Sequence, residues 1–529
     1  MDSQGSEKGQ FRRQIGPIGL FCISVSSVLG SAWLFAALFA AQIAGPAAIL
    51  SWIFASGGAL LLALVFAELG AAFPVAGGLA RFAFFSHGTL VGFASAIACW
   101  LAYVCIAPIE VQAVIRYLAD DLPWLLQPGT AHELSARGVA VAAALLLFFS
   151  VVNGIGIAWM SRLNIILTCW KLVVPVVVPI ALLGVSFRAE NFTEFGGWMP
   201  FGWNGVFSAI STGGALFAFL GFRTAVELAA ESRNPQRDIP FALIGAVAVT
   251  TLIYLLIQVA FIGALSPADL AGGWKNLHSQ VTAGPFVGLA MAAGLAWLAK
   301  LLLVDAVISP GACGLVFTGA TARLLFAMGK NGQIPRAFTA LNGAGVPALA
   351  IGLNFLIGLL FFMPSQTWQS LVNLISSIMI LSLAFGPPAL VALEHSAAEV
   401  PRPFRVPAGR VLIPLSFIIA NCMIYWGGWQ TNALCLGVLA GLLILFTAWK
   451  QAKGALTRKD YEGLYWVAPY LAGLALVSAF GQFGGRHSLS GGLDYLLLTG
   501  LSLGVLAAAR HWGVDPRACR KRLEAGKNL

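Results

Sequence analysis

Apolar residues along this chain run in long continuous stretches and do not alternate with polar residues. A helix that crosses about 30 Å of hydrocarbon needs about 20 predominantly apolar residues, because each residue rises about 1.5 Å. Strands of a membrane barrel would instead alternate over about 10 residues. The pattern therefore predicts an all-α integral membrane protein with about 14 transmembrane helices. The fourteen apolar stretches are 15–40, 47–70, 88–117, 137–153, 162–184, 204–231, 239–264, 284–318, 346–363, 368–393, 411–427, 431–449, 464–482 and 494–510.

The composition agrees with this pattern and excludes most soluble classes of protein. Hydrophobic residues make up 59% of the 529 residues and charged residues 10%, whereas soluble chains hold roughly 45–50% and 25%. The eight cysteines show no CxxC spacing, so we expect neither a metal site nor a disulfide framework. The chain carries neither the HExxH motif of metalloproteases nor the GxxxxGK[ST] motif of ATP-binding proteins. We therefore expect no enzymatic activity and no cofactor.

The distribution of positive charge predicts the orientation in the membrane. Cytoplasmic loops carry an excess of Lys and Arg. With the first residue placed in the cytoplasm, cytoplasmic segments hold 23 of the 31 Lys and Arg residues, outside segments hold 5, and 3 lie within spans. Both termini are therefore expected in the cytoplasm of a multi-pass protein of the cell membrane. The net charge of +10 then reflects topology, and no nucleic-acid partner is expected.

Charged residues inside the apolar stretches are candidates for function. Each one costs at least about 2.5–3.5 kcal/mol at mid-helix on insertion scales. The alternative interpretation is that some of them pair with one another and only hold helices together. The five that lie deepest in predicted spans are Glu110, Lys171, Arg223, Glu227 and Asp305.

Two of the predicted spans are interrupted by small residues. The first contains SSVLGSAW at 26–33 and the sixth contains STGGALFAFLGF at 211–222. Glycine tolerates the backbone torsions of an unwound turn, and such a turn exposes N–H and C=O groups to a ligand near the middle of the membrane. The competing explanation is close helix packing through small residues.

Several separated motifs resemble the amino acid–polyamine–organocation transporter superfamily. The similarity covers roughly residues 12–450 and is closest in character to bacterial aspartate–proton symporters. The motifs that carry it are GSA at 30–32, ELG at 68–70, FPVAGG at 73–78, FAFLGF at 217–222, ESRNPQRDIP at 231–240, RLLFAM at 323–328 and RPFRVP at 402–407.

This resemblance implies a core of two inverted repeats of five helices, in which helices 1 and 6 are broken. The core would occupy residues 15–393, after a cytoplasmic tail at 1–14. Accessory helices 11–14 would follow over 394–510, and a basic cytoplasmic tail would end the chain at 511–529.

The resemblance also implies where an amino acid binds. The amides of helix 1 would receive its α-carboxylate, which the positive end of a helix dipole favours, and the carbonyls of helix 6 would receive its ammonium. Two residues depart from the family pattern, since Ala32 replaces a glycine and Arg223 replaces an acidic residue. The expected substrate-binding residues are Ser27, Gly30, Ser31, Ala32, Phe217, Ala218, Phe219, Gly221, Phe222 and Arg223.

Lys171 is the main candidate for coupling to protons. It resembles the helix 5 lysine of proton-coupled family members, whose ammonium occupies a sodium position. A buried lysine can change its protonation within a transport cycle, whereas an exposed one stays charged. Glu110 and Asp305 follow as weaker candidates, because each lies near a proline kink where water could reach it. Either carboxylate could instead neutralise Lys171 or Lys300.

Arg223 determines the expected substrate. A planar guanidinium binds a carboxylate through two hydrogen bonds and stays protonated, so an acidic amino acid such as aspartate or glutamate is expected, imported with protons by alternating access. Glu227 lies four residues further on and could neutralise Arg223, which would leave a pocket for neutral amino acids. The same fold could also serve an amino-acid exchanger, a nutrient sensor or a channel.

Overall fold

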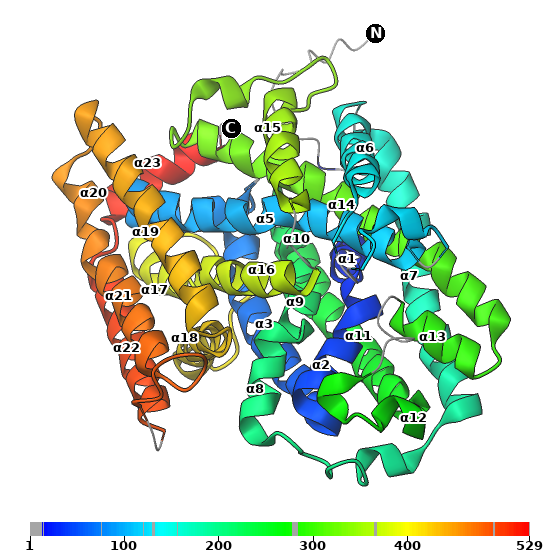
Figure 1. The fold of residues 1–529 in the computed structure, drawn as a ribbon. Helices are drawn as coiled ribbons and strands as arrows, with labels where there is room; N and C mark the ends of the chain where they lie inside the picture. The colour runs from blue at the N-terminus through cyan, green and yellow to red at the C-terminus, as the bar shows by residue number, and fades with distance from the viewer. Residues whose placement is uncertain are drawn as a thin grey trace.

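The computed structural model is built from helices, with no strand among the residues that it describes (Figure 1). Only two isolated bridges, Ile15 with Ser232 and Leu126 with Leu134, join extended residues. The fold class expected from the apolar stretches is thus confirmed. The described residues are 13, 15–75, 77–119, 121–129, 133–155, 157–277, 284–363, 368–489 and 492–527.

The helices follow the apolar stretches of the sequence. In the first half of the chain they are α1 (Pro17–Val28), α2 (Ala32–Ala44), α3 (Ala48–Ala72), α4 (Gly78–His87), α5 (Thr89–Leu118), α6 (Ala136–Ile155), α7 (Ile157–Ser186), α8 (Gly202–Thr212), α9 (Ala215–Phe219), the 3-10 helix η4 (Leu220–Arg223), α10 (Thr224–Glu227) and α11 (Pro235–Ala264). In the second half they are α12 (Pro267–Leu270), α13 (Pro285–Ala292), α14 (Ala296–Lys330), α15 (Ala348–Leu359), α16 (Trp368–Leu383), α17 (Gly386–Ser396), α18 (Gly409–Trp426), α19 (Trp429–Ala452), α20 (Arg458–Glu462), α21 (Leu464–Phe480), α22 (Leu493–His511) and α23 (Pro516–Lys527).

By length and composition, eleven helical segments of the described chain can cross a membrane, or twelve if one bent pair is a single span. The sequence predicts fourteen, and the difference has a physical origin. The first predicted span is divided, because α1 has only 12 residues, and α2 continues almost directly into α3 as one apolar segment of 41 residues. The helical segment Ala348–Phe362 is also shorter than a full span.

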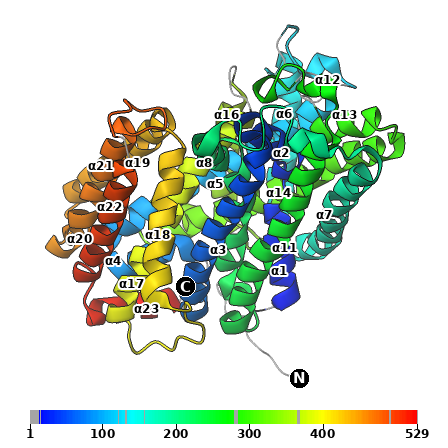
Figure 2. The same cartoon turned by 90° about the horizontal axis from the view of Figure 1, so that it is seen from below.

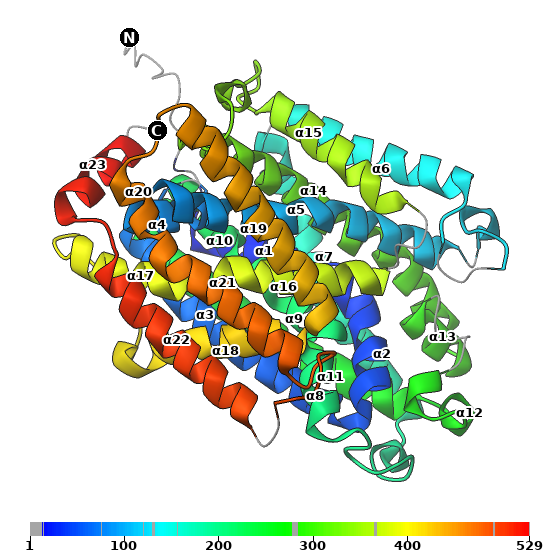
Figure 3. The same cartoon turned by 60° about the vertical axis from the view of Figure 1, so that its left-hand side comes forward.

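Helix α5 runs through the middle of the molecule and packs against α14 and α16 (Figure 1). Most of its residues are buried, which explains why its apolar stretch shows no polar face. Helices α19, α21 and α22 lie side by side at one flank (Figure 3). Helices α1 and α23 reach the same end of the molecule, and α12 and α13 lie at the opposite end (Figure 2). We call the first end the termini face.

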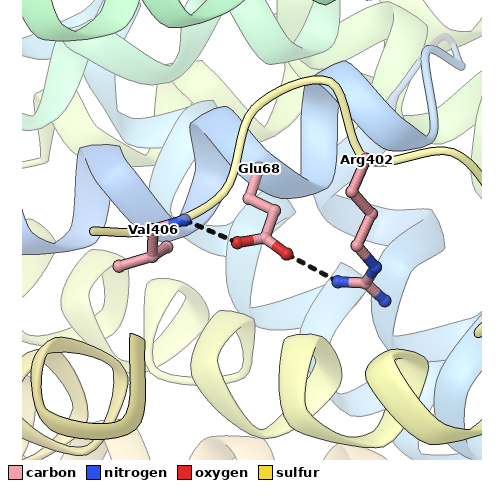
Figure 4. Close-up of polar contacts among 3 residues, drawn as sticks. All are labelled: Glu68, Arg402 and Val406. Atoms are coloured by element: carbon pink, nitrogen blue, oxygen red, sulfur yellow. Dashed lines mark hydrogen bonds and ion pairs between the residues drawn. The ribbon is translucent and has the colours of Figure 1, made fainter. Parts of the chain in front are cut away.

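Two of the family-like motifs bind each other near the termini face. The Glu68 carboxylate, on α3, accepts a hydrogen bond from Arg402 Nη1 at 2.6 Å and another from the Val406 amide at 2.8 Å (Figure 4). The side chains of Glu68 and Arg402 are only 3% and 6% exposed. The loop after α17 is therefore fastened to α3 by a buried ion pair.

Breaking this pair should destabilise the protein. Replacing Glu68 by Gln keeps the shape of the side chain but leaves Arg402 buried without its counter-ion, which typically costs about 3–5 kcal/mol. We expect a clearly lower melting temperature in detergent. The matched control is Asp515→Asn, which breaks the exposed ion pair of Lys459 and Asp515 and should leave the melting temperature almost unchanged. Equal losses in both variants would contradict this role of Glu68.

Candidate functional site

The first apolar span is interrupted between α1 and α2, at residues 29–31. The carbonyls at the end of α1 accept hydrogen bonds from side chains of other helices. Lys171, from α7, donates from Nζ to the Ser26 carbonyl at 2.6 Å, and Tyr254, from α11, donates from its hydroxyl to the Val28 carbonyl at 2.9 Å. Polar side chains thus satisfy part of the unpaired end of this helix.

The other side of the interruption is the N-terminus of α2, and it holds a carboxylate of the protein itself. Ser31 is the N-cap of α2, and its amide donates to Glu110 Oε2 at 2.8 Å. The Ser31 hydroxyl accepts a hydrogen bond from Trp368 Nε1 at 2.9 Å. A helix N-terminus favours negative charge, so this position suits the carboxylate of Glu110, which is 1% exposed.

The sixth predicted span is bent by 46° between α8 and the helical segment that begins at Ala215. Gly214 permits the bend, because its φ of +88° is a torsion that other residues rarely adopt. Further along, a Cβ atom on Gly221 would lie 2.2 Å from the Ser27 carbonyl oxygen. Only glycine fits there, so η4 of the sixth span lies in direct contact with the last turn of α1.

A small cavity lies where the end of α1, the start of α2, α9 and η4 come together. Its volume of about 10 Å³ is close to what a single water molecule needs, so an amino acid fits only when these elements move apart. Its walls come from α1, α2, α5, α9, η4 and α14. It is lined by Ser27, Val28, Gly30, Ala32, Ile106, Glu110, Phe217, Leu220, Gly221, Cys313 and Phe317.

Six residues expected at the site line this cavity, namely Ser27, Gly30, Ala32, Glu110, Phe217 and Gly221. Ser31 takes part through its amide. Ala218, Phe219 and Phe222 are buried beside the cavity without lining it. The sequence analysis missed Cys313, Phe317 and Trp368, which lie 200 or more positions from the first interruption and carry no local signal of a binding site.

Aromatic side chains close the cavity on the side away from the termini face. Trp368 begins α16 and is 2% exposed. Its ring stacks on Phe39 at a centroid distance of 5.4 Å and meets Phe217 edge-on at 6.1 Å. Phe35 packs against the same indole at 5.1 Å. Trp368 thus joins Ser31 to Phe217, which lines the cavity.

A wider cavity of about 110 Å³ lies toward the termini face, and Ile15, Glu227, Glu231 and Arg323 are among its lining residues. Arg323 and Glu231, from two of the family-like motifs, form an ion pair there at 3.2 Å. Glu227 is only 3% exposed and lies at the buried end of this cavity. We call this cavity the vestibule.

Arg223 lies outside both cavities and is fully buried. Its guanidinium lies over the ring of Tyr103 at 4.3 Å, Nη1 donates to the Ser382 hydroxyl at 3.2 Å, and Nη2 contacts the sulfur of Met379. Nε has no partner among the described residues.

Glu227 does not form an ion pair with Arg223 within 4.0 Å in the described structure. Its Oε1 accepts a hydrogen bond from the Tyr103 hydroxyl at 3.4 Å, and Oε2 has no partner among the described residues. Tyr103 therefore contacts both charged groups, the guanidinium through its ring and the carboxylate through its hydroxyl. The ring of Tyr103 also meets Phe317 edge-on at 5.2 Å, and Phe317 lines the small cavity.

Asp305, on α14, is fixed by neutral partners. Trp170 Nε1 and the Ser309 hydroxyl each donate to its Oδ1 at 2.7 Å. In the described structure, Asp305 forms no ion pair within 4.0 Å with Lys171 or Lys300, and Lys300 is exposed. Asp305 and Lys171 interact electrostatically at longer range, and so do Glu110 and Lys171.

Comparison with known proteins agrees with the resemblance seen in the sequence. Residues 15–440 match the family described as amino acid permease. The chain is 36% identical to the glutamate/serine transporter AimA of Bacillus subtilis strain 168, over 93% of each chain. It is 35% identical to the aspartate-proton symporter of the same strain, over 97% of this chain and 99% of the relative. The branched-chain amino acid permease BcaP of that strain is 26% identical over 83% of this chain and 94% of the relative.

These matches and the apolar helices identify a multi-pass membrane transporter and not an enzyme. The resemblance to the amino acid–polyamine–organocation superfamily is thereby confirmed. The chain belongs to the amino acid permease family of that superfamily.

Proposed function

We propose that this protein imports an acidic amino acid, such as aspartate or glutamate, together with a proton by alternating access. Two relatives at 35–36% identity over nearly the whole chain support the proposal, since one is named an aspartate-proton symporter and the other a glutamate/serine transporter. The termini face is the cytoplasmic face of the cell membrane, as the excess of Lys and Arg in those segments favours. Residues 15–393 form the inverted-repeat core and 394–510 the accessory helices.

The small cavity between the two interrupted spans is the substrate site. The α-carboxylate binds at the N-terminus of α2, where the Ser31 amide is the hydrogen-bond donor. The ammonium binds carbonyl groups of the interrupted sixth span. The close approach of Gly221 to Ser27 supports this assignment, because it places η4 of the sixth span against the end of α1, beside the small cavity.

The acidic side chain of the substrate pairs with Arg223. The observation that carries this assignment is that the buried guanidinium has no carboxylate within 4.0 Å in the described structure, although Glu227 lies four residues away. Glu227 interacts with Arg223 only electrostatically, beyond ion-pair distance, and a substrate carboxylate in contact with the guanidinium would compensate the buried charge more fully. The edge-on pair of Tyr103 and Phe317 separates Arg223 from the cavity, so a shift of this pair admits the substrate side chain to Arg223.

The structure has the features of a state that is closed toward the outside. Trp368 and its aromatic neighbours pack on the outer side, and Tyr103 connects Phe317, which lines the small cavity, to Glu227, which lines the vestibule. The ion pair of Glu231 and Arg323 lines the vestibule and lies at the cytoplasmic exit of the transport path.

Lys171 couples transport to protons. Its ammonium donates to the Ser26 carbonyl and to the Ser26 hydroxyl, at 2.6 and 3.3 Å, and thus contacts the end of α1. When Lys171 loses its proton, this helix end loses its positive partner and can move. Glu110 and Asp305 lie in the electrostatic field of Lys171 and are the carboxylates through which the proton reaches it.

The test is uptake of radiolabelled aspartate into proteoliposomes with an imposed pH gradient. We expect accumulation that requires an acidic exterior, and competition by unlabelled glutamate and aspartate. Inhibition by leucine or alanine, with none by aspartate or glutamate, would instead support a permease for neutral amino acids. Counterflow without accumulation would indicate an exchanger, and binding without any flux would indicate a sensor.

Serine is the second substrate candidate, because one relative is named a glutamate/serine transporter. Inclusion of serine in the competition series distinguishes the two. Serine has no side-chain carboxylate, so a preference for serine would mean that the substrate does not pair with Arg223. A preference for aspartate would support that pairing.

A further inference from the structure

Glu110 occupies the place where the substrate carboxylate is expected. Its Oε2 accepts the hydrogen bond of the Ser31 amide at the N-terminus of α2, and its side chain lines the small cavity. The fit is tight, because a Cβ atom on Gly30 would lie 2.6 Å from Glu110 Oε1 and 2.9 Å from the sulfur of Cys313. The protein thus supplies a carboxylate of its own to the site.

Two carboxylates cannot occupy this position together. The Ser31 amide has one hydrogen to donate, and like charges that share a buried site strongly disfavour double ionisation. A substrate carboxylate that takes the Ser31 amide must therefore displace that of Glu110. Glu110 then stays buried beside a second negative charge unless it gains a proton.

We propose that Glu110 is an internal substitute for the substrate carboxylate, so that binding of an amino acid requires Glu110 to take up one proton. This inference rests on the proposed function and specifies how the proton is loaded. The proton comes from the aqueous solution and binds to a carboxylate oxygen of Glu110. The hydrogen bond of the Ser31 amide passes to the α-carboxylate, and the position carries one negative charge before and after binding.

The groups around Glu110 are compatible with such an exchange. Lys171 from α7, Cys313 from α14 and Tyr254 from α11 are the titratable groups that interact with it electrostatically. Helix α2, at whose end the carboxylate lies, has no ionisable side chain. Lys171 is the only one of these groups that carries positive charge, and it binds the other side of the interruption, at Ser26.

The two buried charges thus match the two ends of the interrupted span. The carboxylate of Glu110 lies at the N-terminus of α2, and the ammonium of Lys171 lies at the C-terminus of α1, each where the helix dipole favours its charge. Glu110 and Lys171 interact electrostatically. Removal of Lys171 should therefore shift the pH range in which Glu110 takes up its proton on binding, and it should end accumulation, because the proton can no longer pass from Glu110 to Lys171.

Calorimetry of aspartate binding to the purified protein in nanodiscs tests the proposal. Comparison of buffers with different ionisation enthalpies gives the number of protons taken up. For the wild type we expect uptake approaching one proton and a Kd that rises roughly tenfold per pH unit where empty Glu110 is ionised. In Glu110→Gln we expect binding with no such uptake and a Kd nearly independent of pH.

The control is Asp494→Asn. Asp494 is a buried carboxylate on α22, away from the small cavity, and it accepts a hydrogen bond from Tyr425 at 2.7 Å. This variant should keep the proton uptake of the wild type. Infrared difference spectra of the wild type provide a second measurement that needs no variant, and a protonated carboxyl band should appear when aspartate is added. That band should be absent in Glu110→Gln.

The outcomes separate this inference from the proposed function. If folded Glu110→Gln keeps the full proton uptake, or binds no aspartate at all, Glu110 does not compete with the substrate. The absence of a new carboxyl band in the wild type would have the same meaning. If the wild type binds neither acidic nor neutral amino acids, the proposed function itself is wrong.

Discussion

Lys171→Gln should abolish the accumulation of aspartate that a pH gradient drives. Symport of one proton with each substrate supports roughly tenfold accumulation per unit of pH gradient, since one unit corresponds to about 1.4 kcal/mol. Glutamine can still donate to the Ser26 carbonyl, which Lys171 contacts at 2.6 Å, but it cannot gain or lose a proton. The expected accumulation ratio in proteoliposomes is therefore about one, while counterflow exchange of labelled aspartate continues.

The control for this variant is Lys300→Gln. Lys300 lies on α14, which packs against α7, but its side chain is exposed. Lys300→Gln should therefore accumulate aspartate as the wild type does. Full pH-driven accumulation by Lys171→Gln would remove this lysine from the coupling mechanism. A loss of both accumulation and counterflow in a folded variant would show that Lys171 only holds the helix end in place.

The sequence predicted the fold class because the bilayer imposes a simple length rule on apolar helices. Glycine at 30, 214 and 221, singled out in the sequence, marks positions where the backbone is bent or closely approached. The number of spans was harder to predict. A span whose halves are α1 and α2 has no single helix of full length, so its apolar stretch does not translate directly into one helix.

Contacts between distant segments could not be predicted from the sequence. Glu110 was expected on the proton pathway because it is a charge in an apolar stretch, but its bond to Ser31 joins residues 79 positions apart. Glu68 and Arg402 were each seen in a family-like motif, and the structure pairs them across 334 positions. Such pairs are set by tertiary packing, for which local composition carries no signal.

The relation of Arg223 to Glu227 shows a further limit. Four residues apart on an α-helix, two side chains share one face and can pair. Arg223, however, ends the 3-10 helix η4, and Glu227 ends the short helix α10 that follows. A 3-10 helix has about 3.0 residues per turn, so the spacing expected for an α-helix does not hold across this junction. The two charged groups contact the ring and the hydroxyl of Tyr103 instead.

Arg223→Leu should therefore remove the preference for acidic substrates. The loss of one partner of a buried, hydrogen-bonded charge pair costs about 2–5 kcal/mol, which is roughly a 30-fold or larger loss of affinity. We expect that loss for aspartate and glutamate, with little change for serine, which has no side-chain carboxylate. Competition curves for the three amino acids, measured on the variant and the wild type, provide the comparison.

Two further variants separate the substrate role of Arg223 from pairing with Glu227. Arg223→Lys keeps the charge but loses the planar fork of donors, so it should bind aspartate with an affinity between those of the wild type and Arg223→Leu.

Glu227→Gln removes the nearest carboxylate that could neutralise the guanidinium. Because no ion pair joins the two residues in the described structure, we expect Glu227→Gln to retain the preference of aspartate over serine. A gain in aspartate affinity in Glu227→Gln, with an unchanged preference in Arg223→Leu, would instead mean that Glu227 neutralises Arg223 and that the pocket serves neutral amino acids.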